Sequence, residues 1–330
     1  MPLAAAIASG LVAALLYLSV LTGSLGALIL VYLVQLPLFA AGLSLGAKAV
    51  MIAGGTATIV TIVSGGLLSG LLFFLAEALP PMLLVAQALR WHEVDHAVGP
   101  ATDRSAETAS GPGTFENIAW YPLGRLVLWL VGLGVVALVL AAIMLTGGAE
   151  GFRGAMRGFL AGQLGDLLGT SPGAASRSDA MIEALTAFFP AMAVASWLVM
   201  TAINGVLAQG ALARFGLNRR PSPDIAALTL PRWPSFVLAG ALLIAAVGPG
   251  DLGYLGSNLV PLLAIAYVFA GLAVLHAVLR RHAGRIFILI PAYATLLLGW
   301  PVLLVAACGM IDQWFGLRQR FAAAVPRQGE

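Results

Sequence analysis

Charged side chains are what this 330-residue sequence most lacks, since Asp, Glu, Lys and Arg make up only 9% of it. Soluble domains average about 25%. Seven stretches contain no charged residue at all: 1–47, 49–76, 126–149, 184–213, 233–250, 252–279 and 286–311. A helix needs about 20 apolar residues to cross a hydrocarbon layer roughly 30 Å thick. The scarcity of charge therefore excludes a soluble fold and predicts an integral membrane protein.

The alternation of polar and apolar residues that marks a transmembrane barrel strand is also missing. The apolar runs are continuous and rich in Leu, Ala, Val and Gly. Because the bilayer core holds no water, every backbone polar group must be paired inside the protein, and here that leaves the helix as the spanning element. The predicted fold class is all-α, a polytopic transmembrane helix bundle.

Cysteine is almost absent too. Cys308 stands alone, which excludes an internal disulfide and a thiolate metal cage. The sequence contains neither an HExxH zinc pair nor a GxxxxGK[ST] phosphate loop. Residues 42–46 match the GxSxG nucleophile-elbow pattern, but that motif requires a strand-to-helix turn and here it ends an apolar helix. We therefore predict no enzyme, no catalytic residue, no metal and no cofactor, and the scattered basic residues do not indicate nucleic-acid binding.

The apolar runs predict nine spans, with eight as the alternative, because 49–89 is divided only at Ser64-Gly65-Gly66 and 235–250 is short. No basic residue precedes the first run, so we interpret it as a retained transmembrane helix rather than a cleaved signal peptide. The expected spans are 3–22, 25–45, 49–65, 67–89, 123–146, 184–211, 235–250, 257–279 and 286–308.

Loop charges predict the orientation, since short cytoplasmic loops carry an excess of Lys and Arg. The loop 212–234 and the turn after the eighth span are both basic and fall on one side. We assign that side, and with it the N-terminus, to the cytoplasm of a multi-pass protein of the bacterial inner membrane. The side of the C-terminus stays open, because nine spans place it outside whereas Arg318, Arg320 and Arg327 favour the inside.

We expect one integral membrane domain over residues 1–330. The loop 90–122 mixes charges and contains the polar stretch 105–113, which predicts a flexible cytoplasmic loop. In segment 147–181, apolar residues recur at helical spacing between polar ones, which predicts an amphipathic helix at the membrane interface. Those apolar residues are Phe152, Met156, Phe159, Leu160, Leu164, Leu167 and Leu168.

Glu77 is the sharpest candidate for a functional residue, because it lies near the middle of the span 67–89. A central acid costs at least about 2.5 kcal/mol on insertion scales and usually faces a cavity or a partner. Pro80 and Pro81 follow, and proline cannot donate a backbone hydrogen bond, so upstream carbonyls are freed. A broken helix beside an ionisable group predicts a solute or proton site. The alternative is a protonated acid bonded to a neighbouring helix for structure alone.

Two intramembrane amides are further candidates. Gln35 lies mid-span, and we expect a second kink at Pro37. Asn204 shares the span 184–211 with Gln209. A separation of five residues places the two side chains about 140° apart around a helix, so we do not expect them to bind the same ligand. We predict Glu77, Gln35 and Asn204 as substrate-binding residues, with interhelical hydrogen bonding as the commoner role of such amides.

Four short motifs resemble those of a known family. The run QLPLFAAGLSLG at 35–46 is followed by ALPPM at 78–82, WYPLG at 120–124 and GMIDQWFGLR at 309–318. Together they resemble the YybS-like family of bacterial integral membrane proteins, whose function is not established. That family is distantly similar to the S components of energy-coupling-factor transporters, which bind vitamins or other small solutes and borrow an ATPase and a coupling protein. The chain is longer than an S component, and no site residue is carried over.

The resemblance implies a small-solute-binding or permease subunit, which suits a chain without a nucleotide-binding motif. Small residues at four-residue spacing in the first span, such as Ala6 and Gly10, let helices approach closely within the chain or against a coupling membrane protein. We predict solute capture between helices kinked at prolines. The rival prediction is a membrane scaffold or assembly factor that docks through the loop 90–122, the helix 151–169 and the Arg-rich tail.

Overall fold

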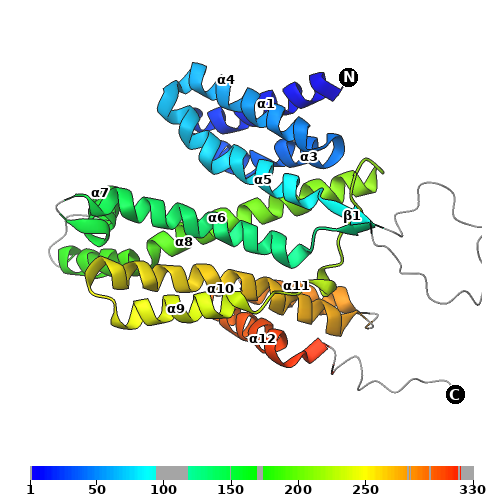
Figure 1. Cartoon of the computed structure of the whole chain (residues 1–330). Coiled ribbons are helices and arrows are strands. Elements are labelled where there is room, and N and C mark those ends of the chain that lie inside the picture. Colours follow the sequence, from blue (N-terminus) through cyan, green and yellow to red (C-terminus); the bar gives the residue numbers. More distant parts are fainter. Residues whose placement is uncertain are drawn as a thin grey trace, which may run out of the picture. The chain divides into compact units, whose positions relative to one another are not determined.

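Helices form almost all of the regular structure, which confirms the all-α fold class (Figure 1). The computed structural model describes residues 2–93, 118–148, 150–168, 174–280, 282, 284–296, 299–318 and 320. The chain forms two compact units, one of Met1–Pro122 with Ile203–Ser222 and one of Leu123–Ala202 with Pro223–Glu330. Our expectation of a single integral membrane domain over 1–330 stays a prediction.

The first unit contains short and long helices and one β-hairpin. β1 (Trp91–Glu93) pairs antiparallel with β2 (Ile118–Trp120), and the end of α8 completes the unit. The rest of the predicted flexible loop 90–122 lies mainly outside the described residues. The other elements are α1 (Pro2–Leu18), a 3-10 turn η1 (Ser19–Thr22), α2 (Leu25–Val31), α3 (Gln35–Leu45), α4 (Ala47–Phe73), a π-helix η2 (Phe74–Ala78) and α5 (Leu79–Ala88).

α4 turns back on itself within the Ser64-Gly65-Gly66 break, which the sequence predicts to separate two spans. Gly66 adopts φ 83° and ψ 170°, a left-handed conformation that favours glycine. A Cβ atom added to Gly70 would lie 3.2 Å from Ile62 Cα, and one added to Gly54 would lie 3.4 Å from Ala78 Cβ. Because these contacts join the two sides of Gly66, the run Ala47–Ala88 is an antiparallel helical hairpin.

The small residues of the first span pack inside the chain. Ala6, Gly10, Ala13 and Ala14 form the buried face of α1. A Cβ atom at Gly10 would collide with the carbonyl oxygen of Ala53 in α4, so glycine is what permits the close approach of the two helices. This face therefore lies against α4, which is the intrachain alternative of the two that the sequence pattern allowed.

The second unit consists of helices alone among its described residues. α9 and α10 form a hairpin in which Gly256 approaches the backbone of Ala245. α8 begins in this unit and its last residues belong to the first. The elements are α6 (Leu123–Thr146), α7 (Gly151–Leu168), α8 (Ala174–Arg214), a 3-10 turn η4 (Ile225–Ala227), α9 (Trp233–Val247), α10 (Gly250–Leu279), α11 (Arg285–Leu296) and α12 (Pro301–Phe315).

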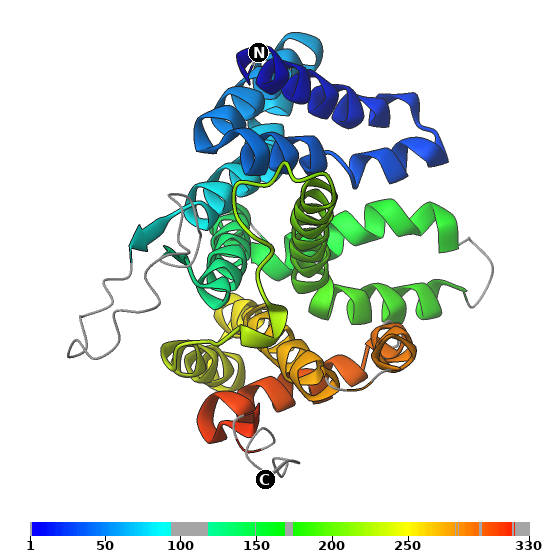
Figure 2. The same ribbon diagram turned by 90° about the vertical axis from the view of Figure 1, so that its right-hand side faces the viewer.

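The segment 147–181 forms α7 and the start of α8, which lie side by side (Figure 2). Arg153 forms an ion pair with Glu183, and Arg157 lies 3.4 Å from the same carboxylate. The apolar face of α7 packs in part against protein, since Phe152 is buried and its ring centroid lies 5.1 Å from that of Tyr254. The segment is helical where it is described, and an amphipathic helix at the membrane interface stays a prediction.

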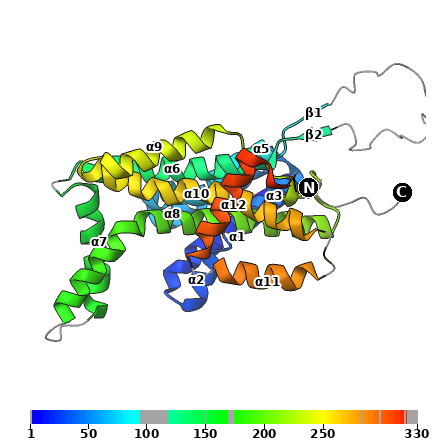
Figure 3. The same ribbon diagram turned by 90° about the horizontal axis from the view of Figure 1, so that it is seen from below.

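The last predicted span, 286–308, is not one straight helix. α11 and α12 are bent by 114° at a short break (Figure 3). The Arg280 guanidinium, just before α11, lies 2.5 Å from the Asp224 carboxylate, and Arg318, just after α12, donates to the Ala226 carbonyl at 2.7 Å. The residues before and after the pair thus contact the same turn. The α11–α12 pair therefore starts and finishes at the same end of the second unit.

The number of spans depends on how the broken helices are counted. By length and composition five described helices are able to cross a membrane, or six if α11 and α12 are taken together. The run Ala47–Ala88 counts there as one helix although Gly66 folds it into two arms. Residues 29–45 and 233–247 form shorter apolar helices. The helical membrane bundle is therefore established, and eight or nine spans stays a prediction.

The return of α12 predicts that the C-terminus shares a side with the turn 224–226. We expect Ala227→Cys and Gln328→Cys, each introduced into a Cys308→Ser background, to react alike with a membrane-impermeant maleimide in intact cells and in inverted vesicles. Pro249→Cys, at the opposite end of the α9–α10 hairpin, is the control and should react in the other preparation. Opposite labelling of positions 227 and 328 would mean that the α11–α12 pair crosses the membrane.

Candidate functional site

Gln35 and Glu77, both predicted from the sequence, lie together in the first unit. Gln35 is the first residue of α3 and is fully buried, and Glu77 lies in η2 and is 6% exposed. Gln35 Nε2 donates to the carbonyl oxygen of Ala76, the residue before Glu77, at 3.2 Å. Tertiary packing thus joins an amide and an acid that are far apart in the sequence.

The two prolines explain why an amide is needed here. The Ala76 carbonyl would accept from residue 80 in an α-helix and from residue 81 in a π-helix. Both positions are proline and have no N–H. The backbone widens into η2, where the Leu79 N–H donates to the Phe74 carbonyl, and Gln35 supplies a donor to Ala76. A side chain from α3 therefore completes the hydrogen bonding of a neighbouring helix.

Two oxygen atoms at this site have no hydrogen-bond partner among the described residues, namely Gln35 Oε1 and Glu77 Oε2. A buried polar atom left unpaired costs about 1–3 kcal/mol, and an unpaired charge costs more. π-helical segments occur frequently at functional sites. The Gln35–Glu77 pair therefore has more hydrogen-bond acceptors than donors. Its two unpaired oxygens are able to accept from a hydrogen-bond donor or to contact a positive charge.

Asn204 contacts the backbone just before α3. Its Nδ2 atom donates to the Tyr32 carbonyl at 2.7 Å, in the break that separates α2 from α3. Tight i to i−3 bonds in that break use the carbonyls of Leu30, Val31 and Leu33. Pro37 occupies the first turn of α3, where a missing N–H is tolerated, so the interruption expected at Pro37 is found directly upstream at residues 32–34.

A third proline break occurs in α8, and the sequence pattern did not predict the residues that complete its hydrogen bonding. Pro190 has no N–H for the Thr186 carbonyl, and the Tyr254 hydroxyl donates to that carbonyl at 2.6 Å. Asn258, four residues further along α10, accepts from the Ala191 N–H at 3.0 Å and donates to the Ala187 carbonyl at 3.3 Å. The available signal was a Tyr–Asn pair at helical spacing in one apolar run and a proline inside another.

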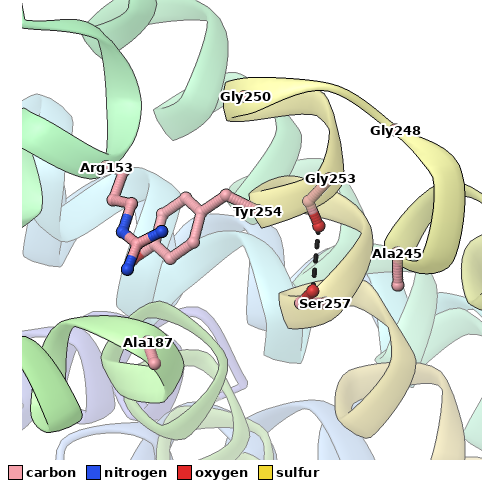
Figure 4. Close-up of a pocket in the computed structure, with 8 residues that line it drawn as sticks. All are labelled: Arg153, Ala187, Ala245, Gly248, Gly250, Gly253, Tyr254 and Ser257. Carbon is pink, nitrogen blue, oxygen red and sulfur yellow. Dashed lines mark hydrogen bonds between the residues drawn. The ribbon is translucent and has the colours of Figure 1, made fainter.

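A cavity of about 300 Å³ lies beside this break in the second unit (Figure 4). Its polar side chains already have partners: Tyr254 bonds Thr186, the Ser257 hydroxyl donates to the Gly253 carbonyl at 2.9 Å, and Arg153 pairs with Glu183. Neither Gln35 nor Glu77 lines it. The cavity has room for a small molecule, whereas the Gln35–Glu77 pair has unpaired polar atoms.

Basic residues gather at one end of the first unit. The Arg220 side chain is 7% exposed and donates to the carbonyls of Ala88 and Tyr121, both at 2.9 Å. Burial lowers the pKa of the Arg220 guanidinium, but a free arginine starts so high that the group stays charged at neutral pH. Arg219 donates to the Ser44 carbonyl at 3.3 Å. These arginines cap the carboxyl ends of α5 and α3, where cations are favoured.

The motif at 309–318 forms a compact C-cap. Gly316 is left-handed with φ 63° and ends α12, and the Arg318 side chain lies 2.7 Å from the mostly buried Asp312 carboxylate. The Arg318 N–H also donates to Asp312 at 3.0 Å. Every polar group of this motif named here has a partner, so its role is to hold the end of α12.

The chain is a multi-pass helical membrane protein. A family described as "Predicted membrane protein (DUF2232)" matches residues 168–313, which is less than half of the sequence. No curated protein and no solved structure matches the chain. The matched region includes the Pro190 break with Tyr254 and Asn258, whereas Gln35 and Glu77 lie outside it. Among the described residues, no group of three or more His, Cys, Asp or Glu is placed to hold a metal ion.

The pairing of the Pro190 break is testable with a double-mutant cycle. Tyr254→Phe removes the donor to Thr186 and should lower the free energy of unfolding by about 0.6–2 kcal/mol, the range of interhelical hydrogen bonds in membranes. In a Pro190→Ala background the restored N–H reaches the same carbonyl, so Tyr254→Phe should cost clearly less. Reversible unfolding in mixed micelles measures all four proteins. Equal costs in both backgrounds would show that Tyr254 does not compensate for Pro190.

Proposed function

We propose that this protein is a non-enzymatic small-solute-binding or permease subunit, with Glu77 and Gln35 as the polar groups of its site. The observation that carries the proposal is a buried acid–amide pair, short of donors, beside a helix broken by Pro80 and Pro81. Ionisable residues within a membrane usually mark a solute or ion pathway. Transporters commonly place their sites at discontinuous helices near the membrane midplane.

Asn204 takes a positioning role in this proposal. Its Nδ2 bond to the Tyr32 carbonyl fixes the break that precedes α3, and Gln35 is the first residue of α3. A change at Asn204 therefore acts on the site through the placement of Gln35. The breaks before α3 and α5 also supply two points at which helices are able to bend, since the regular hydrogen-bond ladder is interrupted at both.

Energy for transport comes, in this proposal, from a partner, because the sequence has no nucleotide-binding motif. The resemblance to the YybS-like family and to S components favours a coupling membrane protein as that partner. The basic end of the first unit faces the cytoplasm of a bacterial inner membrane under the positive-inside rule. Its described basic residues are Lys48, Arg90, Arg214, Arg219 and Arg220.

A ligand screen tests the proposal. The purified full chain is heated in detergent with vitamins, nucleobases, amino acids or lipids, and its melting temperature is recorded. A ligand at 100 times its Kd stabilises the folded state by about 2.7 kcal/mol, which gives a measurable rise. We expect one chemical class to raise the melting temperature of the wild type and not that of Glu77→Gln. Glu93→Gln, at an exposed residue of β1, is the matched control and should respond like the wild type.

Two outcomes would contradict the proposal. If a ligand stabilises wild type and Glu77→Gln equally, its site lies elsewhere, and the cavity beside Tyr254 is the next place to test. If no compound acts while the chain retains bound proteins during purification, the membrane scaffold becomes the better account. In that case deletion of residues 94–117 should release the bound proteins, and Glu77→Gln should not.

A further inference from the structure

The atoms around Glu77 define what sort of group completes the site. Gln35 Nε2 bonds the Ala76 carbonyl, which fixes the orientation of the amide and leaves Oε1 as an acceptor. Glu77 Oε2 is a second acceptor. Positions 80 and 81 are prolines, so the nearby backbone lacks two N–H donors. Every unpaired atom described at this site accepts, and none donates.

No described side chain on the surrounding elements supplies the missing positive charge. η2 packs against α3, α4 and α5. The sole charged residue in these three helices is Lys48, which is exposed in the first turn of α4, and the nearest titratable group of α1 is Tyr17, whose ring packs on Phe73. Glu77 is thus a buried acid without a cationic partner among these elements.

The packing around η2 is close. Phe73 and Ala78, which flank Phe74–Glu77, are both fully buried. Across the hairpin, a Cβ atom added to Gly54 would lie 2.9 Å from Met82 Sδ, so the two arms are in close contact one turn beyond Glu77. A proton needs no space of its own in such packing. The smallest positive charge that satisfies a carboxylate is a proton, which also turns one carboxyl oxygen into a donor.

We propose that Glu77 is a reversible proton-binding site, with the Gln35 amide beside it. The proton comes from water, neutralises the carboxylate on binding and returns to water on release. Release leaves a charged carboxylate beside the Pro80–Pro81 break, which favours a conformation that brings water to Glu77. This inference rests on the proposed function and adds proton binding at Glu77 to it.

Infrared difference spectroscopy of the full chain in lipid tests this inference without any solute. Spectra are recorded while pH is varied, and Glu77→Gln is subtracted from wild type. We expect a carboxylic-acid C=O band that appears in acid, disappears in alkali and is lost in Glu77→Gln but kept in Glu93→Gln. Gln35→Met should move both the band and its pH midpoint, because it removes the amide beside the acid. Gel filtration and helix content confirm that each variant is folded.

Three results would overturn the inference. A Glu77 band that persists at every pH at which the protein stays folded would make the protonated acid purely structural. A carboxylate signal that responds to Na⁺ at constant pH would assign the site to a metal ion. A band unaffected by Gln35→Met would separate the amide from the acid. Because no solute is added, a negative ligand screen with a titrating Glu77 would remove the solute proposal and keep the proton site.

Discussion

The structure depends on one constraint: a backbone carbonyl released by proline must find a donor where there is no water. The chain meets it with side chains from other helices. Gln35 serves the Ala76 carbonyl ahead of Pro80, and Tyr254 serves the Thr186 carbonyl ahead of Pro190. Each bond satisfies the backbone and at the same time ties two helices together. Prolines inside the apolar runs therefore specify which helices pack, because a broken helix is stable only beside the residue that completes it.

Much of the fold follows from the sequence by simple physics. Long runs without charge predict a helical membrane bundle, and the Ser64-Gly65-Gly66 break predicts the place where α4 folds back. The departures have a local cause. The span expected at 286–308 is two helices bent by 114°. The length of an apolar run does not tell whether the chain continues straight or turns back within it. That the pair returns is visible only from Arg280 and Arg318, which contact the same turn through space.

The candidate site was predictable in part. The hydropathy pattern identifies Glu77 as an acidic residue near the middle of an apolar span. The prolines explain why carbonyls near it need donors. Nothing in the sequence joins Gln35 to Glu77, since their proximity arises from the packing of α3 on the hairpin. Tyr254 and Asn258 were not predicted for a related reason: each is an ordinary residue for a membrane helix, and its role is defined by Pro190 on another element. The two polar sites also differ chemically. Around Pro190 the acceptors have donors, whereas at Glu77 acceptors remain in excess.

The central claim is that buried side chains complete helices broken by proline, and that at Glu77 this leaves a surplus of acceptors. An experimental structure of the full chain in lipid, at a resolution that defines side-chain amides, tests it most directly. The account predicts a π-helical turn over Phe74–Ala78 with the Gln35 amide on the Ala76 carbonyl and the Glu77 carboxyl facing inward. A regular α-helix through these residues, with Gln35 and Glu77 turned to separate surroundings, would contradict it.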